Sequence, residues 1–454
     1  MKETDKFGTE PLGKLLKEQA LPASIGILIM SLYGIIDTIF VGHFVGYEGI
    51  GAITVVLPIT FLIASIGMAI GVGGASVISR ALGAKLFDKA LLTFGNQITL
   101  TMGLALVFVL FGFVFNEQIL TLFGGKGAIL EPALIYFNVV LLGIPFLAWA
   151  MMSNNVIRAE GFPKVAMYVM IIPAIVNVIL DPIFIVVFDM GIAGAAWATT
   201  LSYLMSAIFT IYHFTHGKSQ LVPKVVHFKL NKPLVKEISS LGSVTFARQG
   251  VISILAIVLN NSLFHYGGEL GLSVYGIVSR VLMFANFPVL GITQGFVPIA
   301  GYNYGARLKK RLVKVIRLAV IWSSLFSLVI FTLLMVFAPS IVTFFTIDKE
   351  LITAAIQPMR IVFLATPLLS VSLIISALYQ STGHAKPALL LALTKQGFFL
   401  IPLVVILPLI FGINGIWMAF PLADIGAAAI CWWYYKKNGI QYRETTPPND
   451  LAYL

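Results

Sequence analysis

The sequence predicts an all-α membrane protein with twelve transmembrane helices, arranged in two six-helix lobes related by a pseudo-twofold axis along the membrane normal. Composition gives the first indication, because 59% of the 454 residues are hydrophobic and only 11% are charged, against about 25% charged residues in soluble domains. Apolar runs recur along the whole chain, each long enough to cross a hydrocarbon core of roughly 30 Å as a helix. Short motifs also recur at a nearly constant offset, which indicates two related halves.

Each apolar run predicts one span. The twelve expected ranges are 19–43, 51–80, 90–115, 131–157, 163–188, 191–215, 237–265, 272–302, 313–338, 351–380, 387–411 and 413–435. Basic residues gather in alternate connections, and the opposite set of connections holds only Lys126 and Lys349. The positive-inside rule therefore predicts a multi-pass protein of the cell inner membrane with both termini in the cytoplasm.

Three motif pairs define the repeat. They are ALGAK at 81–85 with NYGAR at 303–307, RAEGFPKVA at 158–166 with QSTGHAKPA at 380–388, and GIAGAAWA at 191–198 with GINGIWMA at 412–419. The first two pairs stand 222 residues apart and the third 221. Because six is an even number of spans, the two lobes are parallel repeats with a central cleft between them. The expected parts are an N-lobe with its cytoplasmic tail (1–217), a cytoplasmic linker (218–236), a C-lobe (237–437) and a cytoplasmic tail (438–454).

The net charge of +11 does not indicate a nucleic-acid partner, because the basic residues lie in short segments between spans. The lipid bilayer is the expected partner, and we expect a monomer. No nucleophile–base pair and no metal-ligand motif appears, so the sequence predicts neither an enzyme nor a bound cofactor.

Two aspartates interrupt apolar runs that should lie in lipid. Asp37 and Asp181 each place a carboxylate there, which costs about 3 kcal/mol on insertion scales and usually marks an ion or substrate path. A rise of about 1.5 Å per residue puts both in the outer half of the bilayer. Asn177 lies one turn from Asp181 on the same face, and Thr199 and Tyr136 should reach the same depth. These oxygens suit a proton relay or a Na⁺ site, although interhelical hydrogen bonding alone would explain Thr199 and Tyr136.

Several motifs carry a family resemblance. They are LYGIIDTIFVG (32–42), RAEGFPKVAM (158–167), NVILDPIFI (177–185), GIAGAAWAT (191–199), FARQG (246–250) and GITQGFVPIAGYNYGA (291–306). Through them, essentially the whole chain resembles the MATE (multidrug and toxic compound extrusion) transporters of the DinF/MepA-like branch. Members of this family export cationic, amphiphilic drugs or toxic metabolites in exchange for H⁺ or Na⁺.

The resemblance also implies residue roles. The family's cation site uses acidic and polar residues of the N-lobe, which by motif position are Asp37, Asn177, Asp181 and Thr199, with Tyr136 beside them. These four positions are also the ligands expected if the coupling ion is Na⁺. A NorM-like branch has a further acid in span 7, but residues 243–264 contain none, so a C-lobe cation site of that kind is not expected.

Candidate substrate contacts are soft or polar side chains inside the spans. They are Met30, Asn154, Met170, Arg248 and Gln249. Methionine adapts to varied ligands, but packing or structural hydrogen bonds would explain each of these residues as well. An alternative function is a lipid-linked precursor flippase of the same superfamily, which should line its cleft with arginines. Candidates for that role are Arg248, Arg280 and Arg360.

The last spans carry one residue of each charge. Lys395 lies about 12 Å into the membrane from the cytoplasmic side, and Asp424 about 16 Å from the outer side, so the two reach similar depths. Because a lone charge is costly in lipid, we expect a buried Lys395–Asp424 ion pair that joins spans 11 and 12. A structural role is favoured over a second coupling site.

Overall fold

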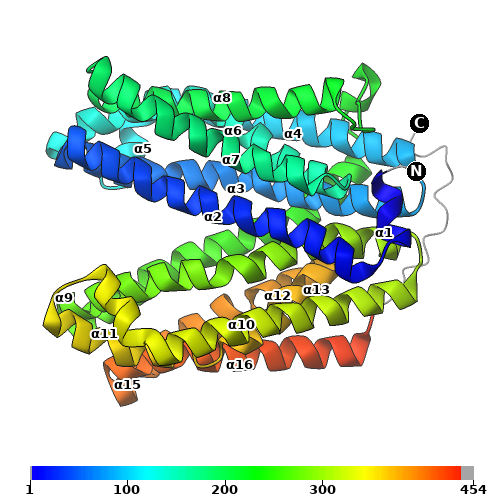
Figure 1. Cartoon of the computed structure of the whole chain (residues 1–454). Helices are drawn as coiled ribbons and strands as arrows, with labels where there is room; N and C mark the ends of the chain where they lie inside the picture. The colour runs from blue at the N-terminus through cyan, green and yellow to red at the C-terminus, as the bar shows by residue number, and fades with distance from the viewer. Residues whose placement is uncertain (1–2, 441–454) are drawn as a thin grey trace. The chain divides into compact units, whose positions relative to one another are not determined.

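The computed structural model describes residues 3–440, nearly all of them in helices (Figure 1). The predicted cytoplasmic tail beyond residue 440 lies outside the described residues. The helices up to the linker are α1 (Lys6–Thr9), α2 (Leu12–Phe44), α3 (Tyr47–Gly83), α4 (Phe87–Val114), α5 (Asn116–Leu122), α6 (Leu130–Ala159), α7 (Pro163–Pro182) and α8 (Gly191–His216). After the linker come α9 (Lys232–Gly305), α10 (Lys309–Phe345), α11 (Lys349–Val362), α12 (Thr366–Ser381), α13 (Ala385–Leu393), α14 (Ile401–Ile406), α15 (Pro408–Phe411) and α16 (Ile413–Asn438).

The helices account for the predicted twelve spans. Ten helical segments of the described chain are long and apolar enough to cross a membrane, and α11 with α12, bent by 48°, supplies an eleventh. Helix α9 is 74 residues long, which at 1.5 Å per residue is about 110 Å and too long for one crossing. It breaks at Gly268, whose φ of 59° is a conformation that glycine adopts without strain. The two halves of α9 therefore count as separate spans.

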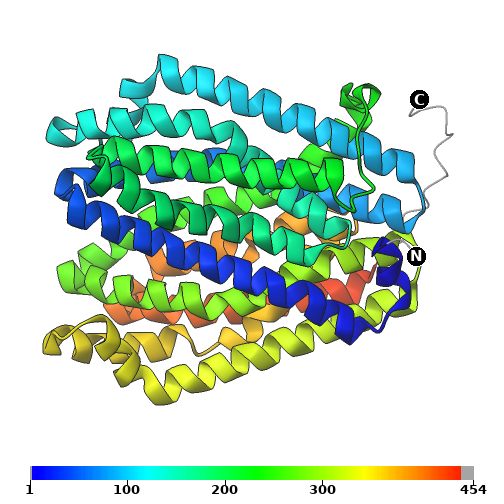
Figure 2. The ribbon, with the colours of Figure 1, turned by 45° about the horizontal axis from the view of Figure 1, so that its top comes forward.

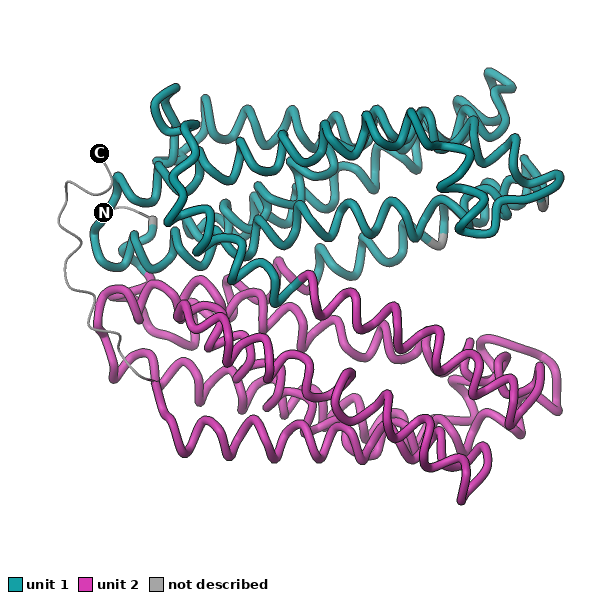
Figure 3. Tube along the Cα trace, turned by 180° about the vertical axis from the view of Figure 1, so that it is seen from behind, with its two compact units in different colours: residues 1–6, 25–245 teal, residues 7–24, 246–454 magenta. Residues whose placement is uncertain are grey.

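The helices pack into two compact units (Figure 3). Among the described residues, unit 1 is built from residues 3–6 and from Ile25–Thr245, and unit 2 from Phe7–Ser24 and from residues 246–440. These boundaries differ from the predicted lobes, because residues 7–24 pack in unit 2 while the 218–236 linker and the first turns of α9 pack in unit 1. The unit boundaries thus fall inside α1, α2 and α9, rather than in loops.

Unit 1 is organised around α6. This helix packs against α3 on one side and α8 on the other, while α4 lies beside α3 and α7 beside α8 (Figures 1 and 2). Apolar side chains of these helices form a buried core that includes Val56, Phe137, Leu141 and Ile144. The core lies at the end of the bundle where α3 and α6 begin. Its packing fixes the positions of these two helices relative to each other.

Unit 2 has its own core. Residues from both halves of α9 pack with α10, α11, α14 and α16, and Leu259, Val278, Phe363, Val404 and Trp417 lie fully inside it. Helix α12 lies between α10 and α16. Each half of α9 thus buries one side in this core.

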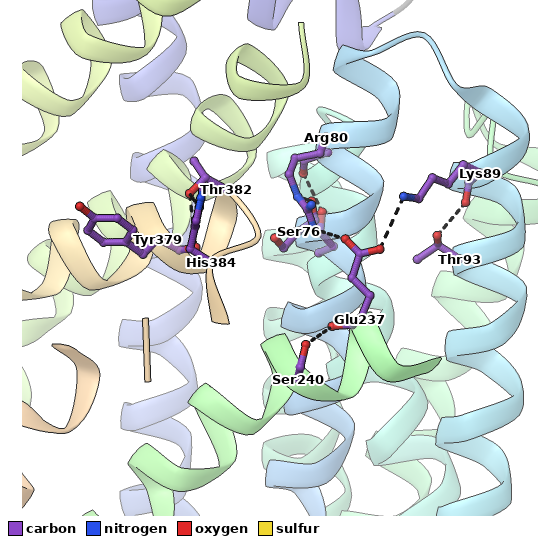
Figure 4. Close-up of polar contacts among 11 residues, drawn as sticks. Ser76, Arg80, Lys89, Thr93, Glu237, Ser240, Tyr379, Thr382 and His384 are labelled. Carbon is purple, nitrogen blue, oxygen red and sulfur yellow. Dashed lines mark hydrogen bonds and ion pairs between the residues drawn. The ribbon is translucent and has the colours of Figure 1, made fainter. Parts of the chain in front are cut away.

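Specific hydrogen bonds explain why the linker packs in unit 1. The amide Nδ2 of Asn96 on α4 donates to the carbonyl oxygens of His227 (3.3 Å) and Lys229 (3.1 Å), and its Oδ1 accepts from the backbone N–H of Asn231 (2.7 Å). Two ion pairs add to these bonds in the first turns of α9. The Glu237 carboxylate lies between Arg80 (2.9 Å) and Lys89 (3.5 Å), as Figure 4 shows. Contacts of this kind join residues remote in sequence, so no sequence pattern predicts them.

A corresponding set of bonds holds the N-terminal segment in unit 2. Asn303 Nδ2 donates to the carbonyl oxygen of Phe7 (3.0 Å), and Arg311 Nη2 donates to the carbonyl oxygens of Phe7 (3.1 Å) and Glu10 (2.6 Å). The Phe7 ring is buried and packs edge-on against Tyr302 at 5.8 Å between ring centroids. Each unit therefore binds the segment that leads into the other repeat.

Candidate cation site

The predicted site residues meet inside unit 1. Asp37 on α2 and Asp181 on α7 are buried, with 7% and 0% of their surface exposed, and their carboxyl groups lie close to each other. The sequence could place these acids only at similar depth. The structure shows that they also face each other across two helices of one unit.

An asparagine joins the acid pair to α8. Asn177, one turn before Asp181 on α7, donates from Nδ2 to Asp181 Oδ1 (3.3 Å) and to Thr199 Oγ1 (3.4 Å). Asn177 is fully buried and Thr199 is 4% exposed. The phenol of Tyr136 on α6 lies close to the Thr199 hydroxyl in turn. All five predicted residues thus form one continuous polar cluster.

Two further tyrosines belong to the cluster and were missed in the sequence. Tyr33 and Tyr203 lie close to each other and close enough to Asp37 to interact with its charge. The available signal was helical spacing, because Tyr33 is one turn before Asp37 on α2 and Tyr203 is one turn after Thr199 on α8. They bring two further phenol groups near the carboxyl pair.

The backbone of α7 is irregular beside the acids. Pro173 and Pro182 lie within the helix, and residues Ile183–Val187 directly after it form a π-helical turn. Proline removes a backbone hydrogen bond, and π-helical turns often occur at functional sites. The helix that carries Asp181 and Asn177 therefore has the geometry of an element that can bend.

The cluster has more acceptors than donors. Asp37 Oδ1, Asp181 Oδ2 and Asn177 Oδ1 are buried and have no hydrogen-bond partner among the described residues. Buried polar atoms are normally paired, and two contacting carboxylates repel each other when both are charged. A proton or a monovalent cation would satisfy these oxygens, and carboxylate, amide and hydroxyl oxygens are the ligands that hard cations prefer.

Two candidate substrate residues of unit 1, Asn154 and Met170, make structural contacts. Asn154 Nδ2 donates to the carbonyl oxygen of Ala166 (2.6 Å), and its Oδ1 accepts from Arg158 Nε (3.1 Å). Met170 on α7 packs against Gly26 of α2 and accepts a weak hydrogen bond from Arg158 Nη2 (3.8 Å). These contacts join α6, α7 and α2 at the end of the unit away from the acids.

The remaining substrate candidates are half-buried. Met30 lies on α2 in unit 1, whereas Arg248 and Gln249 lie on α9 just inside unit 2. Nothing in the structure assigns a ligand to these three side chains, and their role as substrate contacts stays a prediction.

The predicted charge pair is present in unit 2. Lys395 Nζ lies 2.6 Å from Asp424 Oδ1, with 22% and 5% of the two side chains exposed. Lys395 belongs to a π-helical turn, Thr394–Leu400, and Asp424 lies in the middle of α16. The contact joins spans 11 and 12 as the depth count predicts, and its structural role stays a prediction.

One buried acid lies outside the spans. Glu160, in the turn between α6 and α7, is 2% exposed and accepts hydrogen bonds from Ser219 Oγ (2.9 Å) and from the backbone N–H groups of Gln220 (3.0 Å) and Leu221 (3.1 Å). Burial raises the pKa of Glu160 from 4.5 to about 7, against the opposing effect of these hydrogen bonds. The sequence did not predict the burial of Glu160, because an acidic residue in a short turn is normally expected to be exposed to solvent.

The similarity to known proteins extends over most of the chain. A family model described as MatE matches residues 22–183 and again residues 245–406. The two matches begin 223 residues apart, which confirms the two related halves predicted from the motif pairs. Together they cover more than half of the chain.

Individual relatives match over nearly their full length. The multidrug export protein MepA of Staphylococcus aureus (strain NCTC 8325 / PS 47) is 29% identical over 418 residues, 92% of each chain. MepA of Staphylococcus haemolyticus (strain JCSC1435) is 28% identical over the same length. A crystal structure of a MATE protein in complex with MaD3S superposes with a TM-score of 0.90 at 24% identity, over 96% of this chain and 98% of that one. This last similarity shows the fold.

Proposed function

Because the chain belongs to the MATE family of membrane transporters, we propose that it is a cation-coupled multidrug efflux antiporter. It exports amphiphilic, often cationic compounds by alternating access, in exchange for H⁺ or Na⁺. The MepA relatives, named for multidrug export, support the direction and the breadth of transport. In this proposal the protein works as a monomer in the cell inner membrane with both termini in the cytoplasm. The distribution of basic residues supports the position of the termini.

The contact between Asp37 and Asp181 carries this proposal. Two buried carboxyl groups on different helices, with unpaired oxygens beside them, are costly for a protein that only needs to fold. The cost is understandable if the pair binds and releases a cation in each transport cycle. Asn177 and Thr199 orient the Asp181 carboxyl, and they are two further oxygen ligands if the ion is Na⁺.

Exchange measurements in proteoliposomes test the proposal. A fluorescent cationic drug should be exported when a H⁺ gradient or a Na⁺ gradient is applied alone, and the gradient that works identifies the coupling ion. Asp37→Asn and Asp181→Asn should each reduce this gradient-driven transport at least tenfold while the protein stays folded.

Asp189→Asn is the matched control, because Asp189 is an exposed aspartate in the turn between α7 and α8. It should transport at the wild-type rate. Wild-type transport by both the Asp37 and the Asp181 variants would end the proposal.

A further inference from the structure

The linker between the two repeats exposes several apolar side chains. It contains a short 3-10 helix, η4 (Val225–Phe228), in which Val225 is 86% and Val226 is 69% exposed. On either side of it, Val222 and Leu230 are each 49% exposed. Single exposed apolar residues are ordinary, but four of them within residues 222–230 form a patch of the kind that contacts a membrane or a partner.

Lysines surround this patch. Residues 217–236 contain five lysines and no acidic residue. All five are exposed and none has an ion-pair partner in the part of the chain that the structure describes: Lys218, Lys224, Lys229, Lys232 and Lys236. Apolar side chains between basic ones are typical of a segment that lies on a membrane surface, because lysine reaches the headgroups while the apolar side chains enter the acyl region.

Hydrogen bonds place the patch on the lipid side of α4. In addition to the bonds made by Asn96, Thr99 Oγ1 donates to the carbonyl oxygen of Phe228 (2.8 Å), so η4 lies beside this helix (Figures 1 and 2). The face that begins at Thr99 continues at spacings of four, three and four residues through exposed positions, which are Gly103, Leu106 and Leu110. Large exposed apolar side chains on a membrane helix face hydrocarbon, and the linker covers the cytoplasmic part of that face.

The position of Asn96 along α4 gives the depth of the linker, because Asn96 binds the backbone of residues 227–231. The charge distribution assigns the end of α4 at Val114 to the outer side. Asn96 is about 27 Å from Val114 along the helix, which is about 3 Å inside the inner edge of a 30 Å core. Counted from residue 90, just after Asp88 and Lys89 at the cytoplasmic end, Asn96 is about 9 Å deep. Both values match the roughly 5–10 Å by which interfacial segments bury their apolar side.

We propose that residues 222–230 form a membrane-surface element, in which Val225 and Val226 enter the inner leaflet and Lys224 and Lys229 bind the phosphate groups of anionic phospholipids. Anionic headgroups give the cytoplasmic leaflet a negative surface potential, which attracts lysines close to the membrane. The bilayer thereby holds the segment that leads into α9. The inference goes beyond the proposed transport function and does not depend on it.

Fluorescence quenching tests whether the patch enters the membrane. Cys431 is the only cysteine of the chain, so Val226→Cys in a Cys431→Ala background accepts a single label, the fluorophore NBD. In nanodiscs, phosphatidylcholine brominated in its acyl chains should quench this label several-fold more strongly than it quenches the same label at Ala84→Cys. Ala84 is the matched position, because it is exposed in the α3–α4 turn at the cytoplasmic end of the same unit. Equal quenching at the two positions would overturn the membrane contact.

Lipid selectivity tests the role of the lysines. At the same mole fraction, brominated phosphatidylglycerol should quench the Val226 label more strongly than brominated phosphatidylcholine, because each lysine raises the affinity for an anionic lipid by about fivefold. Lys224→Gln with Lys229→Gln should make the two lipids quench equally. The matched control is Lys85→Gln with Lys164→Gln, which removes the same charge from exposed lysines elsewhere at the cytoplasmic end of unit 1 and should keep the preference.

Two further outcomes would overturn the inference. Equal quenching by the two lipids before any lysine is replaced would show that no anionic headgroup is bound. Loss of the preference in both double variants would show that net charge, rather than Lys224 and Lys229, selects the lipid. These measurements use no gradient and no drug, so their result is separate from that of the transport experiments.

Discussion

Gly73 in unit 1 and Gly295 in unit 2 are 222 positions apart and make the same kind of contact. Gly73 on α3 lies against the backbone of Ile238 and Gly242 in the first turns of α9, and Gly295 on the second half of α9 lies against the backbone of Ala20 in α2. Each glycine lets the helix that leads into the other repeat approach closely, as small residues do in membrane helix packing.

This relationship predicts a stability effect. Gly73→Ala and Gly295→Ala should each lower the unfolding temperature in detergent, because the new Cβ would meet backbone atoms that cannot move aside: Gly242 N at 2.9 Å and Ala20 N at 2.8 Å. Overpacking of this kind costs about 1–3 kcal/mol.

Gly103→Ala is the matched control. Gly103 lies within α4 with no atom within 4 Å of an added Cβ, so alanine there should be neutral or stabilising by up to about 1 kcal/mol. Equal behaviour of all three variants would show that the close approach does not matter for stability.

The buried acid of the α6–α7 turn predicts a pH dependence. The folded protein holds the Glu160 proton more tightly than the unfolded chain, since the pKa is raised from 4.5 to about 7. The resulting stabilisation is fully present below about pH 4.5 and is lost as the pH rises through 7. The shift corresponds to about 3 kcal/mol.

Comparison with Glu160→Gln isolates this contribution, because glutamine keeps the Oε1 acceptor used by Gln220 and Leu221. Hydrogen exchange of the 219–221 segment, corrected for intrinsic rates, should lose protection between pH 5 and 8 in the wild type and much less in the variant. Identical pH profiles would show that Glu160 does not titrate in this range.

The ion pair of unit 2 predicts non-additive mutations. Asp424→Asn or Lys395→Met alone should destabilise the protein by about 3 kcal/mol, because each leaves one uncompensated polar group in the bundle. The double variant should be more stable than either single variant in thermal unfolding. A fully stable Asp424→Asn with no gain in the double variant would contradict a structural role for the pair.

The prolines in α2 and α7, the helices that carry Asp37 and Asp181, predict that these helices bend during transport. Pro22 lies in α2, and Pro173 and Pro182 lie in α7 beside the π-helical turn, where helices bend most easily. We expect protonation or Na⁺ binding at Asp37 and Asp181 to reshape α2 or α7 and so to weaken drug binding in the N-lobe cleft. Structures at low and high pH, with and without Na⁺, provide the measurement. Identical α2 and α7 under all four conditions would contradict the mechanism.

The parts of the site that sequence reasoning placed are those fixed by helical geometry. Rise per residue gives depth, so Lys395 and Asp424 could be matched across two spans and are in contact. Spacing by one turn gives a shared face, which related Asn177 to Asp181, and these two are hydrogen-bonded. Tyr33 stands at the same spacing from Asp37 and was overlooked because tyrosine is ordinary in a membrane helix.

The parts that sequence reasoning did not place depend on contacts between distant segments. Residues 7–24 pack in unit 2 and residues 218–245 in unit 1, and hydrogen bonds from Asn303 and Asn96 to backbone carbonyl oxygens hold them there. Because every residue has a backbone carbonyl, the sequence does not show which ones accept these bonds. The burial of Glu160 likewise depends on the path of the 219–221 segment. Neither feature leaves a periodic pattern in the chain.

The crossing of α2 and α9 between the units has a consequence for how such a chain can be divided. A fragment cut at residue 217 would retain the N-terminal segment but lose Asn303 and Arg311, which bind it, and it would lose the 218–245 segment that completes unit 1. Neither unit is therefore encoded by one continuous half of the sequence, because each unit takes a segment from the other side of the linker. Both units can be complete only when the two halves are present together.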